Sequence, residues 1–470
     1  MPITRSDRRR RGRAGSAALL TLALVLAGCS GDDAPPPEAE TEGAQAREGR
    51  AVDAPNVARG VTRALARRAD AVRTGDRDAF LAGVDDKGAR FAQQQASYFD
   101  NLAALPLGEF GYALDRTSLV RDGEDYWVEV DVTLELDGYD AVPVIARDRY
   151  RFSAARSGRF VLTSTKDPAW ERQNRVTSQP WDSGPVTVVS SSGVLGIFDE
   201  GSAAQAGTVM ADVRSGVAAV RAGVPYEWDG RVVVYALSDA RFLAGVEGLP
   251  GDDPLAIDAV TFPVYARPGT GKVASTRFVL NPRMLATPGP SRQRLVRHEL
   301  THVALGERQD GVPTWFSEGL SEYVSVQALA PDARAISGAA LEAAERGLTD
   351  LPSDDGFNGP ASQANYGIAW WACEYLATSY DESMLWVLLD AMTGSEGADG
   401  ALQRVLGIDE KKLARKAGRL MLDTYRPEPP KKEPEPSESP GDEPSDEASE
   451  DPSDGPSEGS GQPSDKPSKR

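Results

Sequence analysis

The two histidines of this 470-residue chain, His298 and His302, lie four residues apart, and Glu299 directly follows the first. Side chains four apart share one face of a helix at a separation of about 5–6 Å, so both imidazoles can hold one metal ion. The carboxylate of Glu299 would then lie close enough to that ion to act as a general base toward a water molecule. The spacing therefore predicts a zinc site built for hydrolysis.

The sequence leaves the third metal ligand to a carboxylate, because a catalytic zinc ion takes three protein ligands and no other histidine occurs. Four acidic residues follow the motif closely: Glu307, Asp310, Glu318 and Glu322. We expect Glu307, at the end of the first helix, to point away from the metal, and Asp310 to lie in a turn. Glu318 and Glu322 fall one turn apart on a second predicted helix, so both stay candidates.

The second helix carries a motif of its own, Trp315-Phe316-Ser317-Glu318-Gly319-Leu320-Ser321-Glu322-Tyr323. Together with the His-Glu-x-x-His run, it resembles the gluzincin zinc metallopeptidases, specifically the peptidase MA-like family. The resemblance implies that Glu318 is the third zinc ligand and that Glu322 holds a ligating histidine through its second ring nitrogen. The stretch between His302 and Glu318 is shorter than in the best-known gluzincins, which leaves an exchange of roles between the two glutamates open.

The same resemblance implies Zn²⁺ as cofactor and a peptide or protein as substrate. Glu299 would take a proton from the attacking water and deliver it to the leaving amine. Tyr366 matches the family's tyrosine that follows the second helix, so it is the candidate donor to the oxyanion, with a packing role as the alternative. The strand expected to hold substrate at a sheet edge is Arg277 to Asn281.

The N-terminus has the pattern of a secreted lipoprotein. Basic residues from Arg5 to Arg13 precede an apolar stretch, Ala14 to Ala27, that is too short to span a membrane as a helix. The run Leu26-Ala27-Gly28-Cys29 resembles a bacterial lipobox, which implies lipid on Cys29 and an extracytoplasmic protein anchored to the bacterial cell membrane. The alternative is an ordinary secretory signal. Residues 1–29 are therefore predicted to be a signal peptide.

Composition limits the remaining possibilities. A formal net charge of −19 argues against a nucleic-acid partner, because little could neutralise a phosphate backbone. Residues 30–52 and 426–470 are rich in acidic residues and proline, and they are predicted to be a disordered tether and tail. Once Cys29 carries lipid, Cys373 is the only thiol left, and its apolar neighbours predict a buried residue.

The ordered part is predicted to be α+β in two domains. Residues 53–178 begin with helices and continue with alternating strands, which loosely resembles the SnoaL-like and nuclear-transport-factor-like cone fold. Residues 170–184 read as a linker. Residues 185–425 are expected to form a zincin-type peptidase domain, with Ser291 capping the metal-site helix and Gly306 ending it.

Two other functions stay open at this point. The chain could be a non-catalytic lipoprotein that keeps the fold as a binding module, or a zinc hydrolase that acts on cell-wall peptides. The retained set of His298, Glu299, His302 and Glu318 favours an active enzyme over a binding module. Ligands alone do not separate protein substrates from wall peptides.

Overall fold

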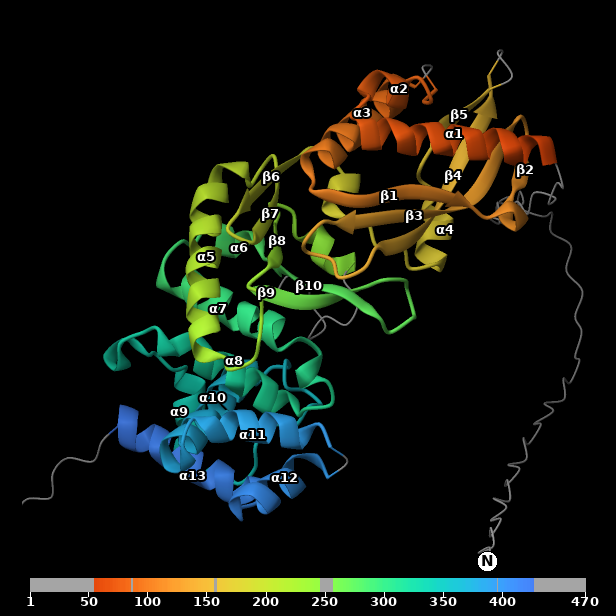
Figure 1. Ribbon diagram of the computed structural model, residues 1–470. Coiled ribbons are helices and arrows are strands. Elements are labelled where there is room, and N and C mark those ends of the chain that lie inside the picture. Colours follow the sequence, from red (N-terminus) through yellow and green to blue (C-terminus); the bar gives the residue numbers. More distant parts are fainter. Residues whose placement is uncertain (1–54, 86–87, 156–158, 246–256, 395, 427–470) are drawn as a thin grey trace, which may run out of the picture. The chain divides into compact units, whose positions relative to one another are not determined.

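The computed structural model describes residues 55–426, apart from 86–87, 156–158, 246–256 and 395 (Figure 1). The described residues all fall within one compact unit. They form the mixed α+β fold that the sequence predicted, and the structure adds that the strands make two separate five-stranded sheets. The predicted signal peptide with Cys29, the tether at 30–52 and the tail lie outside the described residues, except that residue 426 ends the described part.

The first sheet is antiparallel, with β1, β3, β4 and β5 side by side and β2 paired to the N-terminal end of β3. Its strands alternate buried and partly exposed side chains, so that Val128 and Val130 of β3 face helix α1 within one core. The elements are α1 (Pro55–Thr74), α2 (Arg77–Leu81), α3 (Ala89–Ala104), β1 (Leu107–Leu114), β2 (Val120–Asp122), β3 (Asp125–Leu136), β4 (Val144–Ala154) and β5 (Phe160–Ser164).

The second sheet has the order β6-β7-β8-β10-β9, with β7, β8 and β10 parallel and the two outer strands antiparallel to their neighbours. Every residue of β8 is buried, as a strand covered on both faces requires. The strands are β6 (Val186–Ser191), β7 (Val194–Asp199), β8 (Val232–Ala236), β9 (Ala259–Tyr265) and β10 (Val273–Leu280).

The prediction that residues Arg277 to Asn281 form a sheet edge was wrong. Residues Arg277 to Leu280 belong to β10, which lies between β8 and β9, and the edge strand beside the metal-site helix is β9. Phe278, Val279 and Leu280 are all nearly fully buried because β10 is covered on both faces. Pro263 suits β9, since an edge strand can carry a residue without a backbone N–H.

The two faces of the second sheet pack against different partners. On one face, Val232, Val234 and Phe278 join α5 (Ala206–Gly223) and the helices that follow the sheet in the largest core. On the other face, Val233 and Tyr235 pack against residues of the first half, including Phe99 and Leu102 of α3. The first sheet and its helices therefore cover an apolar face of the second sheet.

The segment expected to be a linker takes part in this packing. It contains most of helix α4 (Pro168–Gln173), and Trp181 is 4% exposed within the shared core. The backbone carbonyl of Trp181 also accepts a hydrogen bond of 2.9 Å from Asn101 Nδ2. The large apolar surface of an indole explains why this stretch packs instead of crossing solvent.

Helices form most of the remainder. None of the described helices has the length and apolar character needed to span a membrane. The helix of the His-Glu-x-x-His motif begins at Pro290 with Gly289 before it, so Ser291 is inside the first turn and is not the cap, whereas Gly306 ends the helix as predicted. These helices are α5 (Ala206–Gly223), α6 (Pro282–Leu285), α7 (Pro290–Leu305), α8 (Thr314–Gln327), α9 (Gly338–Glu345), α10 (Ser362–Tyr380), α11 (Ser383–Met392), α12 (Gly397–Leu406) and α13 (Glu410–Tyr425).

Candidate metal centre

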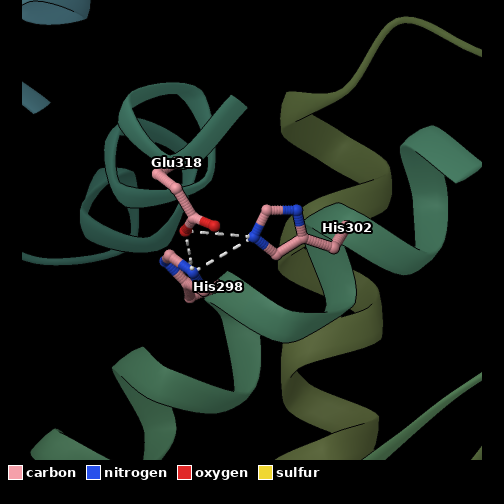
Figure 2. A group of neighbouring side chains, drawn as sticks. All are labelled: His298, His302 and Glu318. Carbon is pink, nitrogen blue, oxygen red and sulfur yellow. Dashed lines mark hydrogen bonds and ion pairs between the residues drawn. The ribbon is translucent and has the colours of Figure 1, made fainter. Parts of the chain in front are cut away.

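Two adjacent helices bring the predicted ligands together. His298 and His302 lie one turn apart on α7, and Glu318 comes from the first half of α8 (Figure 2). Glu318 Oε2 is 3.1 Å from His298 Nε2 and 3.4 Å from His302 Nε2, and the two Nε2 atoms are 3.2 Å apart. The three donor atoms therefore converge on one point. Glu318 reaches the two histidines because α7 and α8 pack against each other.

The size of this donor triangle fits a zinc ion. In a tetrahedral site with bonds of 2.0–2.1 Å, neighbouring donor atoms lie about 3.3 Å apart. The three separations here, 3.1, 3.2 and 3.4 Å, are close to that value. Two imidazoles and one carboxylate are also a donor set that zinc accepts, and three protein ligands leave one position for water. The residues present thus fit the implied metal in both chemistry and spacing.

Both imidazoles are oriented through their other ring nitrogen. His302 Nδ1 is 2.8 Å from Gln309 Oε1, which can only accept, so the proton belongs on Nδ1 and Nε2 keeps its lone pair. His298 Nδ1 lies 3.2 Å from Glu322 Oε1, within ion-pair distance although without hydrogen-bond alignment. Arg294 of α7 in turn forms an ion pair with Glu322. Each imidazole therefore has a polar neighbour at Nδ1 that keeps its Nε2 turned toward Glu318.

The electrostatics of the cluster favour positive charge at its centre. Burial lowers the pKa of His298, but the carboxylates of Glu318 and Glu322 beside its two ring nitrogens outweigh it and raise that pKa well above its usual value. Burial likewise raises the pKa of Glu318, yet the two imidazoles outweigh it and hold that pKa below its usual value. Two carboxylates facing two imidazoles can thus compensate a cation, and a metal ion would compete with protons for this place.

Glu299 lies beside the centre and is held by the edge strand. Its side chain is buried, and burial raises its pKa above the usual carboxyl value. The hydroxyl of Thr261 on β9 is 2.7 Å from Glu299 Oε2 and 3.1 Å from the backbone carbonyl of the same residue. A carboxylate with a raised pKa and one fixed oxygen is suited to move a proton.

A cleft of about 490 Å³ opens over this cluster, and Tyr366 forms part of its wall. The Tyr366 ring lies 6.0 Å from the His298 ring, and its hydroxyl donates to Asn358 Oδ1 at 3.0 Å. Burial and the nearby glutamates raise its pKa well above the usual value, so the phenol keeps its proton. Tyr366 is therefore placed among the predicted site residues with a proton that it can donate.

Glycine is required after Glu318 because α8 and α10 pack very closely there. A Cβ atom on Gly319 would overlap the carbonyl oxygen of Ala369 on α10. Trp315 of α8 and Trp370 and Trp371 of α10 are all buried in the largest core, and Cys373 is buried there as predicted. These residues hold α8, which carries Glu318, against α10.

The structure separates the acidic candidates. Glu318 and the two histidines are the group whose ligand atoms can meet at a metal ion, among the residues that the structure describes. Glu322 instead faces Nδ1 of His298, the ring nitrogen that points away from Glu318. Glu307 and Asp310 line the cleft but do not join that group.

Four contributors were not predicted from the sequence: Thr261, Arg294, Gln309 and Asn358. Gln309 could have been predicted from the sequence. A zinc-bound histidine needs an acceptor for its second ring nitrogen, and Gln309 lies in the short loop between the two motif helices. Thr261 could not, because its contact with Glu299 depends on how β9 packs beside α7 in the folded chain. No protein-family model and no curated protein matches this chain.

Proposed function

We propose that this chain is a zinc-dependent metallopeptidase of the gluzincin type, anchored outside the cytoplasmic membrane by lipid on Cys29. The observation that carries the proposal is the tetrahedral spacing of His298 Nε2, His302 Nε2 and Glu318 Oε2 beside the buried Glu299. The second sheet with α7 and α8 would be the zincin-type domain, and the first sheet with α1 to α3 a SnoaL-like cone. A zinc ion in this place would supply a Lewis acid and an acidified water molecule.

The chain's own residues divide the remaining work. Glu299 accepts the proton of the attacking water and passes it to the leaving amine, while Thr261 keeps the carboxylate aimed by holding Oε2. Tyr366 exchanges its hydrogen bond to Asn358 Oδ1 for one to the oxyanion that develops on the scissile carbonyl. Glu322 and Gln309 keep the two imidazoles turned inward. Glu318 is assigned the ligand role over Glu322 because its oxygen faces both Nε2 atoms.

Substrate would bind as an added strand along β9. This strand is the edge of the second sheet nearest to α7, and Ala259 to Tyr265 supply residues to the cleft wall. An extended peptide on a free edge gains main-chain hydrogen bonds that do not depend on its sequence. The geometry therefore supports a peptide substrate more directly than a small molecule.

The test measures metal content and hydrolysis on the full chain and two variants. We expect one zinc per chain, retained in Glu299→Gln and weakened in Glu318→Ala, with hydrolysis of casein or a quenched peptide library lost in both. Absence of zinc in the wild-type chain would refute the metal centre. Tight zinc binding with no hydrolysis of proteins, but with release of cell-wall peptides, would redirect the proposal to wall hydrolysis. Tight zinc binding with neither activity would indicate a binding module.

A further inference from the structure

A second hollow adjoins the metal cleft. It measures about 920 Å³ and shares Phe262, Pro263 and Tyr265 of β9 with that cleft. Its opposite wall comes from β4, α4 and residues 174–179 of the first half of the chain. Tyr265 is 41% exposed, an unusual state for a large apolar side chain in the described part of the molecule. One continuous surface thus runs from the metal centre along β9 to the first sheet.

The two walls of this hollow are tied together by hydrogen bonds. The backbone N–H of Ile145 donates to the Ala266 carbonyl at 2.8 Å, and that of Ala141 donates to Ala274 at 2.7 Å. Arg267 Nη1 also donates to Asp131 Oδ2 at 3.1 Å. These bonds join the start of β4 to the hairpin of β9 and β10. A hollow whose walls are already fixed loses little entropy when a ligand binds.

The lining combines aromatic surface with positive charge. Its aromatic residues are Trp170, Phe242, Phe262 and Tyr265, and its charged residues are Arg147, Arg175, Arg267 and Asp131. Arg147 and Arg267 share Asp131, and Arg147 is also 3.7 Å from Glu129, outside the lining. For Arg175 the structure shows no acidic partner within the described residues. The hollow therefore has a surplus of positive charge in a chain whose net charge is −19.

We propose that this hollow, here called the arm site, binds an acidic and aromatic stretch of an extended polypeptide substrate. The inference rests on the proposed peptidase function and specifies its substrate. Tyr265 lies four residues along β9 from Thr261, which corresponds to about 13 Å of strand. A peptide added to β9 reaches the arm site about four or five residues from the bond held at Glu299. Long chains with acidic and aromatic side chains at that distance are then preferred over short peptides.

The test compares labelled peptides on the full chain carrying Glu299→Gln, which prevents turnover. A core hexapeptide is extended to a dodecapeptide, in one peptide at its N-terminus and in another at its C-terminus. Each extension contains Asp and Phe, or Lys in their place. We expect one of the two acidic extensions to lower Kd about tenfold or more, which corresponds to about 1.4 kcal/mol, and the Lys extensions to give no gain. Charge reversal by Arg175→Glu should remove most of the gain.

A matched reversal provides the control. Arg415 is exposed on α13, away from the lining residues, and Arg415→Glu should leave the gain intact. Equal Kd values for core, acidic and Lys peptides, or a gain that survives Arg175→Glu, would overturn the arm site.

Hydrolysis by the chain with Glu299 intact separates this inference from the proposed function. Cleavage of core and acidic peptides with no preference for length rejects the arm site and keeps the peptidase. Selective tight binding of one acidic dodecapeptide, with no peptide cleaved, keeps the arm site and rejects the peptidase.

Discussion

Removing one partner of the buried ion pair between Asp140 and Arg277 tests how the two halves of the chain hold together. Asp140 follows β3 of the first sheet, and Arg277 belongs to β10 of the second. Their side chains are 0% and 2% exposed, and Arg277 Nη2 donates to Asp140 Oδ1 at 2.7 Å. The same carboxylate accepts from Ser275 Oγ at 2.6 Å and from the Leu136 N–H at 2.8 Å. The perturbation is Asp140→Ala.

The expected loss follows from what remains after the substitution. Burial opposes the charge of Arg277, but Tyr235 and Asp140 outweigh it and raise the pKa of the guanidinium, so it stays charged. Without Asp140, the Arg277 guanidinium still donates to the Tyr235 hydroxyl at 2.6 Å, but it has lost the carboxylate that balanced its charge. Breaking a buried pair in this way costs about 3–5 kcal/mol. That is a large part of the 5–15 kcal/mol by which folded proteins are usually stable.

The assay is urea unfolding of the full chain, with the free energy obtained by linear extrapolation. The double variant Asp140→Ala/Arg277→Met removes the stranded charge and keeps an apolar side chain, so it should be more stable than Asp140→Ala alone. A loss below about 1 kcal/mol in Asp140→Ala would refute the reasoning, because it would lie within the range of an exposed pair. A double variant no more stable than the single one would refute it as well.

The remaining predictions concern the site and its support. Thr261→Val should lower kcat about 10–100-fold with KM and zinc content unchanged, because one charged hydrogen bond to Glu299 is lost, whereas Thr261→Ser should keep most activity; equal loss in both would contradict a positioning role. Gln309→Leu should weaken zinc binding about 10–100-fold in chelator competition, and unchanged affinity would count against its contact. Gly319→Ala should lower stability by about 1–3 kcal/mol in urea, since its Cβ overlaps α10. Burial raises the pKa of Asp148 to about 7, so the folded state binds the proton more tightly and stability falls as pH rises from 4 to 7. Asp148→Asn should remove that fall, which we expect to be about 1–2 kcal/mol after allowance for partial exposure, and an unchanged pH profile of the melting temperature would disprove it.

The local features of the site could be predicted from sequence because they follow from helix periodicity. His298 and His302 share a face of α7 for that reason, and Gly306 ends the helix because its φ of 52° suits glycine. The succession of helices and then alternating strands in residues 53–178 was likewise predicted from apolar spacing. Each of these features depends on residues within one or two turns or along one strand.

What only the tertiary structure decided depends on distant segments. Sequence left Glu318 and Glu322 open, and the packing of α7 against α8 placed Glu318 at the Nε2 atoms and Glu322 at Nδ1. Strand order likewise has no local signal, which is why β10 was mistaken for the edge and Thr261 of β9 was missed. Periodicity reports which face of an element is buried, whereas the neighbour on that face is set by long-range packing that the local pattern does not encode.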